Sequence, residues 1–222
     1  RVDWVTETAA ASVLLMDRAG AEPLVLTERD GVREYHTVFF ARKDSGIESL
    51  DDLAGRTIAF QRRNSTSAYF APAAALLEAG HPLEILLSPT DRPRRPAVGY
   101  VFARSELNIA TWVHKRLVDA GVMSNIDWDN PQRMPPGFAA DLRVLARTDA
   151  FPRALELARA DMDPKVKARL RELLLQAPDD PDAREAMLRF FGTTRFMPYD
   201  DEARAALERL GVGVQRVRME VE

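Results

Sequence analysis

Three consecutive hydroxyl side chains, Ser65-Thr66-Ser67, stand between a strand predicted over 57–60 and a helix predicted over about 68–79. At a helix start, up to four backbone N–H groups lack partners, and the helix dipole places about half a positive charge there. Hydroxyl groups add donors that rotate to suit an oxyanion. The run therefore suits a tetrahedral oxyanion held without Lys or Arg. Plain N-capping of the helix by one serine is the alternative.

The sequence lacks the residues that other common kinds of functional site require. The chain has no cysteine, which excludes disulfides, Cys-ligated zinc and thiol nucleophiles. His36, His81 and His114 are widely separated and form no helix-spaced pair, so we expect no metal site. No glycine-rich nucleotide loop and no G-x-S-x-G elbow occurs. We accordingly expect no catalytic residue, no metal and no cofactor.

The composition is that of an ordinary globular protein. Of the 222 residues, 46% are hydrophobic and 29% charged, and the length allows one large domain or two lobes. A net charge of −3 argues against a dedicated nucleic-acid binder. No apolar run approaches the ~20 residues of a membrane helix. Arginine dominates the 31 basic residues, which we attribute to GC-rich codon usage rather than to function.

Strand and helix patterns alternate along most of the chain. β-branched and aromatic runs predict strands at 2–5, 23–27, 36–41, 57–60, 83–87, 98–102, 120–123 and 141–146. Helical spacing and caps predict helices at about 8–18, 49–53, 68–79, from 105 or 108 to about 119, from Pro164, 182–190 and 200–210. The alternating segment 212–221 predicts a terminal edge strand. Alternating strands and helices imply an α/β fold with parallel strands.

The middle of the chain predicts a lobe of its own. Extended segments near 40–44 and 142–147 bound it, so we expect one lobe inserted in another through two crossing segments. We assign 1–43 and 135–222 to lobe 1 and 44–134 to lobe 2, with a hinge near 41–44 and 144–148. Such a doubly connected pair of lobes is typical of a hinged ligand trap.

Several ordered segments carry a family resemblance. They are YHTVFFARKDSGI at 35–47, SLDDLAG at 49–55, NSTSAYF at 64–70 with Pro72, RVDWVTET at 1–8, and LVDAG at 117–121 with Ser124 and Asn125. Together they resemble the phosphate/phosphite/phosphonate branch of the type 2 periplasmic binding proteins of ABC importers, over about residues 1–130. The part from Leu142 on is similar only loosely.

The resemblance implies a fold and a first set of ligand contacts. The fold is an α/β, two-lobed type 2 periplasmic-binding-protein fold with a ligand cleft between the lobes, here without the family's N-terminal part of lobe 1. Ser65, Thr66 and Ser67 match the residues that hold phosphonate oxygens. Tyr35 matches an aromatic of the hinge strand that lines the cleft.

The remaining candidate ligand residues are less closely matched. Thr6 and Glu7 are expected to face the ligand from lobe 1; Glu7, where some members have an aromatic, either pairs with a ligand ammonium or hydroxyl, or is a surface or capping residue. Ser105 and Glu106 lie where the family has a ligand-contacting loop. Asn125 and Asp127 follow a lobe 2 strand, and Asp127 is either a cleft residue or a turn residue.

The resemblance implies a solute-binding protein outside the cytoplasm, periplasmic or lipid-anchored, although no signal peptide precedes the strand at 2–5. It would capture a phosphonate or related phosphorus oxyanion and deliver it to the permease of an ABC importer. It would not be an enzyme, bind nucleic acid or insert in the membrane. One alternative is the ligand-sensing domain of a membrane signalling receptor. Another is an enzyme on the same scaffold using Glu7 with His36 or Asp127.

Overall fold

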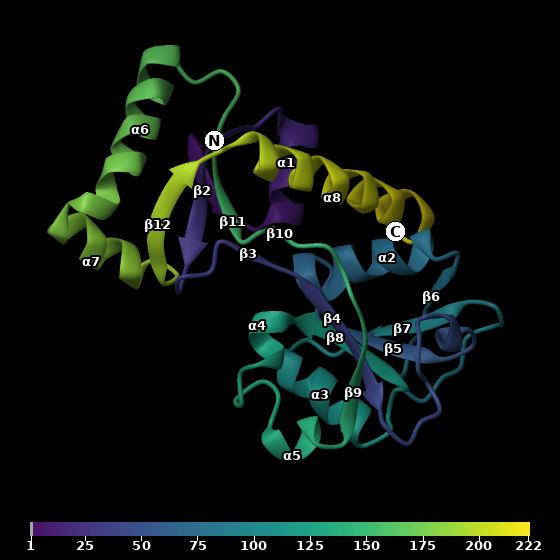
Figure 1. The fold of residues 1–222 in the computed structure, drawn as a ribbon. Coiled ribbons are helices and arrows are strands. Elements are labelled where there is room, and N and C mark those ends of the chain that lie inside the picture. Colours follow the sequence, from purple (N-terminus) through teal and green to yellow (C-terminus); the bar gives the residue numbers. More distant parts are fainter. Residues whose placement is uncertain (1) are drawn as a thin grey trace. The chain divides into compact units, whose positions relative to one another are not determined.

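The computed structural model describes residues 2–222, and the chain forms two compact units. Unit 1 comprises Arg1–Tyr35 and Ala150–Gly211, and unit 2 comprises His36–Asp149 and Val212–Glu222. The chain therefore changes unit three times, at 35/36, 149/150 and 211/212, whereas the sequence predicts two crossings, at 43/44 and 134/135. Figure 1 traces both units along the chain.

The main sheet of unit 1 has the strand order β1-β11-β2-β12, formed by β1 (Trp4–Glu7), β11 (Ala154–Ala158), β2 (Glu22–Arg29) and β12 (Thr193–Pro198). Neighbouring strands are antiparallel. β1 and β2 thus run in the same direction, with β11 between them. The sequence analysis expected parallel strands, and β1 and β2, which α1 connects, are parallel to each other although they are not neighbours. It did not predict β11 and β12. A two-stranded sheet of β3 (Glu34–Tyr35) and β10 (Phe151–Pro152) completes unit 1.

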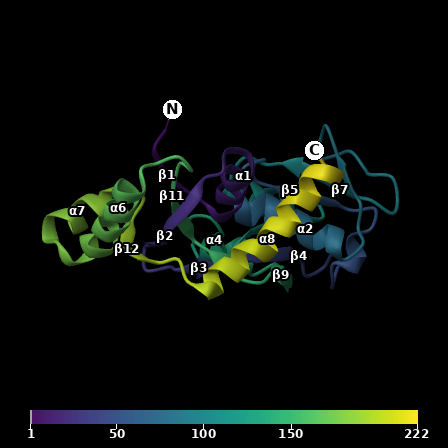
Figure 2. The ribbon, with the colours of Figure 1, turned by 90° about the horizontal axis from the view of Figure 1, so that it is seen from above.

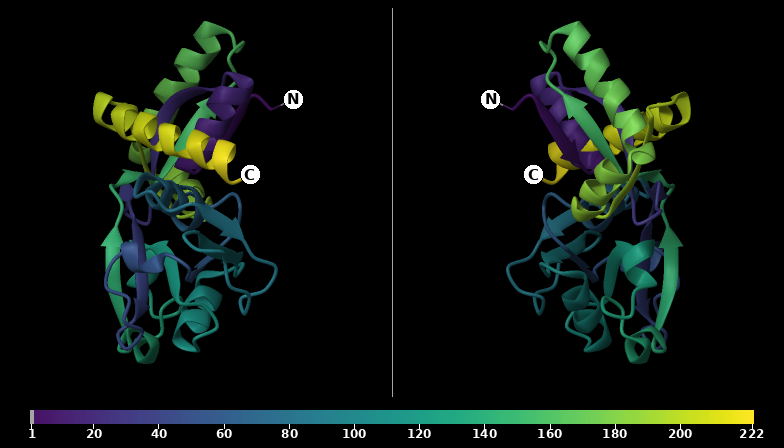
Figure 3. Two further views of the ribbon diagram at one scale, coloured as in Figure 1. Left: turned by 90° about the vertical axis from the view of Figure 1, so that its right-hand side faces the viewer. Right: turned by 90° about the vertical axis from the view of Figure 1, so that its left-hand side faces the viewer.

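Three α-helices lie wholly within unit 1, in the part of the chain that the structure describes. α1 (Ala9–Ala19) lies against β11, as Figure 3 shows in purple, and ends at Gly20, whose φ of 62° is left-handed. α6 (Pro164–Gln176) and α7 (Pro181–Arg189) pack beside β12 (Figure 2), with the short turn η3 (Ala177–Asp179) between them. Asp163 caps α6 by accepting from the N–H groups of Lys165 and Val166.

Unit 2 is built on a six-stranded mixed sheet in the order β6-β7-β5-β8-β4-β9. The strands are β6 (Leu83–Ile85), β7 (Val98–Phe102), β5 (Thr57–Phe60), β8 (Ala120–Ser124), β4 (Thr37–Arg42) and β9 (Leu142–Arg147). The first four are parallel, and β4 is antiparallel to both neighbours. All residues of β5 and β8 are buried, as expected of strands covered on both faces.

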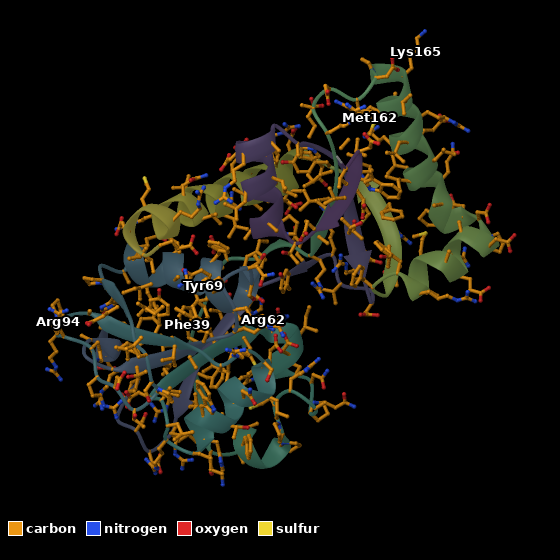
Figure 4. All side chains as sticks on the ribbon, turned by 180° about the vertical axis from the view of Figure 1, so that it is seen from behind. Phe39, Arg62, Tyr69, Arg94, Met162 and Lys165 are labelled. Carbon is orange, nitrogen blue, oxygen red and sulfur yellow. The ribbon has the colours of Figure 1, made fainter. Side chains whose placement is uncertain are left out.

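Short helices cover the sheet of unit 2. They are η1 (Asp51–Leu53), the π-helical turn η2 (Thr66–Phe70), α2 (Ala71–Glu78), α3 (Glu106–His114), α4 (Asn125–Trp128) and α5 (Pro136–Ala139). At Gly121, a Cβ atom would lie 2.6 Å from Ile109, so the glycine lets α3 lie close against β8. Phe39 and Tyr69 point into this unit, whereas Arg94 extends into solvent (Figure 4).

The last element is one long helix, α8 (Asp201–Glu220), so the prediction of a terminal strand over 212–221 is wrong. Its buried residues follow the helical spacing of three or four, and they are Ala203, Ala206, Leu207, Leu210, Val214 and Val217. The alternation of valines that suggested a strand is therefore part of a helical stripe that begins before it. Residues up to Gly211 belong to unit 1 and those from Val212 to unit 2.

Candidate functional site

The candidate site residues of unit 2 meet at one edge of its sheet. β5, β7 and β8 are parallel neighbours, so their carboxyl ends lie at the same edge. The segments that follow these three ends hold six of the residues that the sequence singles out: Ser65, Thr66, Ser67, Glu106, Asn125 and Asp127. This edge of an open α/β sheet is the usual place for a ligand.

The hydroxyl run forms the start of a helix. Ser65 has an extended backbone (ψ 127°), and its hydroxyl accepts from the N–H of Ala68 at 3.1 Å. Phe70 N–H bonds back to the Ser65 carbonyl at 3.0 Å, and the turn continues into α2. Thr66 is buried, and Ser67 is 8% exposed with a hydroxyl that makes no hydrogen bond to any of residues 2–222. Ser65 therefore caps the helix, whereas the Ser67 hydroxyl is unpaired within residues 2–222, and its contact with a ligand stays a prediction.

The start of β4 fixes the position of Ser67. Because β4 is antiparallel to β8, its first residue, Thr37, lies opposite Ser124 at the same edge. The Thr37 hydroxyl donates to the Ser67 carbonyl at 2.7 Å, inside the core. This bond turns the Ser67 carbonyl inward and orients the backbone of the helix start.

Glu106 is the first residue of α3, where Ser105 caps the helix. Its carboxylate accepts from the Gln61 amide at 2.5 Å. Burial raises the pKa of Glu106, and the nearby Asp127 carboxylate raises it further, against the opposing charges of Arg133 and Arg62. Two carboxylates therefore lie near each other at the edge, and one of them takes up a proton more readily than a free glutamate.

Asn125 and Asp127 have structural partners. The Asn125 side-chain oxygen accepts from His36 N–H at 2.9 Å, and Asn125 N–H bonds to the His36 carbonyl at 3.0 Å. The Asp127 carboxylate accepts from the Ser124 hydroxyl at 2.5 Å, and Ser124 in turn caps α4 by accepting from Asp127 N–H. The structure thus gives Asp127 the turn role, and its contact with a ligand stays a prediction.

The candidate residues of unit 1 lie on β1 and β3. The Thr6 hydroxyl donates to Glu156 at 2.6 Å. The half-buried Glu7 carboxylate accepts weakly from Thr8 N–H at 3.4 Å, beside the start of α1. Tyr35 is 5% exposed and packs edge-on against Phe151, with ring centroids 4.7 Å apart. Their roles in binding stay predictions.

Sequence reasoning missed two residues that shape the edge, Gln61 and Thr37. Gln61 directly follows the strand predicted over 57–60, so its place after a strand end was a usable signal. Thr37 gave no such signal, because a threonine inside a β-branched run reads as part of a buried strand.

This fold, with a helix start and two polar loops at the carboxyl ends of the parallel strands of a mixed sheet, is periplasmic-binding-protein-like. The sequence model described as "ABC transporter, phosphonate, periplasmic substrate-binding protein" matches residues 1–203. The chain belongs to this family, a family of substrate-binding proteins that serve ABC transporters outside the cytoplasm. Within residues 2–222, every helix is too short or too polar to cross a bilayer.

Solved structures agree with this assignment. XAC2383 from Xanthomonas citri bound to ATP is 50% identical, with a TM-score of 0.95 over 100% of this chain and 81% of that one, and it is also known bound to chloride. A binding protein component of an ABC phosphonate transporter from Pseudomonas aeruginosa is 22% identical, with a TM-score of 0.66 over 98% and 70%. PhnD1 from Prochlorococcus marinus in complex with methylphosphonate is 19% identical, with a TM-score of 0.64 over 97% and 79%. The last two show the two-lobed fold.

Proposed function

We propose that the chain binds a phosphorus oxyanion, a phosphonate or a phosphate-containing molecule, at residues 65–67 of unit 2 and delivers it to an ABC importer. One observation carries this proposal: the hydroxyl of Ser67, a residue only 8% exposed, has no hydrogen-bond partner within residues 2–222 and stands at a helix start on the carboxyl edge of parallel strands. A tetrahedral oxyanion offers hydrogen-bond acceptors to the Ser67 hydroxyl and to the N–H groups of the helix start.

The charge balance of the site fits an anion held by dipoles. The Ser65 oxygen already accepts from Ala68 N–H, so its proton is free to be donated. The partial positive charge of the helix start favours a negative group there. Glu106 with its raised pKa can donate a hydrogen bond to an oxyanion when it is protonated, as the oxygen of a neutral carboxyl does.

The ligand class is supported by relatives. XAC2383, which shares half of its aligned residues with this chain, is bound to ATP in one structure and to chloride in another, and both are anions. The family description names phosphonate. We therefore propose phosphorus oxyanions as the class, with phosphate groups of nucleotides included.

Thr6, Glu7 and Tyr35 of unit 1 are proposed to contact the non-phosphorus part of the ligand. Because the Thr6 hydroxyl donates its proton to Glu156, it can offer a ligand only its acceptor lone pairs. Glu7 likewise offers acceptors, so a ligand ammonium or hydroxyl group suits both residues.

Calorimetry and thermal shift with methylphosphonate, phosphate, phosphite and ATP test the proposal on the wild type, Ser67→Ala and the control Ser88→Ala. Ser88 lies in an exposed loop of the same unit, where its hydroxyl contacts Thr90. A ligand at 100 times its Kd should raise stability by about 2.7 kcal/mol. Ser67→Ala should weaken binding by about tenfold, the value of a hydrogen bond to a charged group, and Ser88→Ala should not. If no ligand shifts the melting temperature, or Ser67→Ala binds like the wild type, the proposal fails.

Two further readouts test the transport role. ³¹P NMR after prolonged incubation with methylphosphonate should show the ligand unchanged, because no catalytic group is proposed. The liganded chain should stimulate ATP hydrolysis by its cognate importer in liposomes. Turnover of the ligand would instead support an enzyme, and an importer that does not respond would favour the sensor alternative.

A further inference from the structure

Two arginines of unit 1, Arg29 and Arg153, have guanidinium groups without acceptors. Neither side chain makes a hydrogen bond or ion pair with any of residues 2–222. Both residues are half-buried, and the Nε atom of each is shielded from solvent and unpaired. Arginine stays charged at physiological pH, so partial burial of two such charges without acceptors costs free energy unless an anion joins them.

Aromatic rings hold both side chains in place. The Arg153 guanidinium carbon lies 5.0 Å from the centroid of the Tyr35 ring, which Phe151 fixes edge-on. The Arg29 guanidinium carbon lies 4.9 Å from the centroid of the Phe191 ring. Cation–π contacts of this kind position a guanidinium while leaving its N–H donors unused. The donors are therefore preorganised rather than spread over mobile side chains.

The pairing of β11 with β2 places the backbones of the two arginines at the same end of this strand pair. Ala154, the first residue of β11, pairs with Thr27, so Arg153 directly precedes β11 and Arg29 is the last residue of β2, two positions beyond Thr27. Burial lowers the pKa of Arg29, and the charge of Arg153 lowers it further, while Glu156, Tyr35 and Glu7 oppose these effects. The two positive charges are thus close enough to repel each other.

The nearby carboxylates do not neutralise the pair. One Glu156 oxygen accepts from Thr27 at 2.8 Å, and the other accepts from Thr6 and from Trp4, each at 2.6 Å. Glu7 accepts from Thr8 N–H and forms no ion pair within residues 2–222.

Arg33 of the same unit shows the contrast. Its guanidinium donates to the Asp200 carboxylate at 2.8 Å. The Nε atom of Arg33 is also unpaired, so the difference between Arg33 and the other two arginines is its carboxylate partner.

We propose that Arg29 and Arg153 form a second oxyanion-binding site, located in unit 1, for a phosphate or carboxylate group. Each guanidinium presents a planar fork of N–H donors that matches two oxygens of such a group. The proposal rests on the proposed function, since it gives unit 1 its own group of donors for the class of anionic ligand assigned to the chain.

The test compares pyrophosphate, phosphonoacetate and methylphosphonate by calorimetry on the wild type, Arg29→Gln, Arg153→Gln and the control Arg33→Gln. Loss of a charge-assisted contact should weaken pyrophosphate or phosphonoacetate binding by about tenfold or more in Arg29→Gln and Arg153→Gln. Methylphosphonate binding should stay within about twofold of the wild type, as expected if its single phosphonate group is held at residues 65–67. Arg33→Gln should bind all three like the wild type.

The outcomes separate this proposal from the proposed function. If both substitutions weaken the binding of pyrophosphate or of phosphonoacetate, the site is supported. The probe whose binding is weakened shows whether the site binds phosphate or carboxylate. Unchanged binding of both probes in both variants overturns it. Ser67→Ala with methylphosphonate tests residues 65–67 separately, so either site can fail alone. Circular dichroism and the melting temperature check folding, and Arg29→Lys with Arg153→Lys, which keep the charge but lose the fork, should recover part of the affinity.

Discussion

Glu156 shows how one buried residue organises unit 1. Its side chain is fully buried on β11, in the middle of the sheet, and it accepts hydrogen bonds from Thr27, Thr6 and Trp4. Strands β2 and β1 supply these donors from either side. A buried carboxylate is tolerated only when its oxygens are bonded in this way. The residue therefore links three strands through one side chain.

Glu156→Ala should destabilise the chain by about 3 kcal/mol, because it removes the acceptor and leaves the buried Thr27 hydroxyl unpaired. Glu156→Gln should cost less, since its amide oxygen can still accept. Urea unfolding measures both changes. Glu202→Ala, at a side chain 78% exposed, is the control and should change stability by less than about 0.5 kcal/mol. A loss in Glu156→Ala no larger than that of the control would contradict the assigned role.

Glu106 makes unit 2 sensitive to pH. Its pKa is raised, mainly by burial, above the ordinary value of a glutamate, which describes the unfolded chain. Between these two pKa values the folded state binds the proton that the unfolded state has lost, so stability falls as the pH rises through this window. We expect Glu106→Gln to remove this loss. Its unfolding free energy relative to wild type should therefore be higher at pH 7 than at pH 4. An equal difference at both pH values would show that Glu106 does not titrate in this way.

The site residues were predictable where they follow strand ends. Ser65, Glu106 and Asn125 each come after a β-rich run, and the parallel arrangement of β5, β7 and β8 then brings them to one edge. Arg29 and Arg153 were not predictable, because they are far apart in the sequence and a chain rich in arginine gives no reason to select two of them. The missing information was the antiparallel pairing of β11 with β2.

At the scale of elements, α8 contains two glycines with opposite surroundings. A Cβ atom at Gly213 would lie 2.7 Å from the Ala74 side chain of α2, whereas one at Gly211 would lie 3.5 Å from Val13, an ordinary contact. Helix interiors disfavour glycine by about 1 kcal/mol relative to alanine. The close packing of α8 against α2 therefore requires a glycine at position 213, whereas position 211 has room for a Cβ atom.

Gly211→Ala should stabilise the chain by about 0.5–1 kcal/mol, through the gain in helix propensity. Gly213→Ala should destabilise it by about 1–3 kcal/mol, because the overlap with Ala74 outweighs the same gain. The two variants differ by two positions in one helix and serve as controls for each other in urea unfolding. Destabilisation by both, or by neither, would contradict the packing described here.

The elements show why sequence periodicity succeeded for some segments and failed for others. β5, β7 and α6 lie where they were predicted, because their runs are bounded by clear turns or caps such as Asp163. The sequence analysis divided α8 into a helix and a strand, because Gly211 and Gly213 are helix-breaking signals when no element is known to pack against them. β12 was missed because TTRFMP follows two helical segments and its sheet partner, β2, lies about 170 residues earlier, a distance that local patterns do not span.

At the scale of the whole chain, each unit has its own core, and α8 contributes to both. Leu207, 2% exposed, belongs to unit 1, and Val217, fully buried, belongs to unit 2. The three passages of the chain between the units mean that sequence neighbours on α8 stabilise different folded bodies. Local unfolding should therefore follow the units rather than the order of the sequence.

Leu207→Ala should raise amide hydrogen exchange chiefly in unit 1, at β2 and β11, and Val217→Ala chiefly in unit 2, at β5 and α2. Each substitution removes buried methyl groups, at a cost of about 2–4 kcal/mol for Leu207→Ala and about 1–3 kcal/mol for Val217→Ala. Hydrogen exchange read by mass spectrometry resolves the two units peptide by peptide. Met219→Ala, at a side chain 79% exposed on the same helix, is the matched control and should leave exchange in both units unchanged. If either core substitution accelerates exchange equally in both units, the chain unfolds as one cooperative body, and the division of α8 between two cores is wrong.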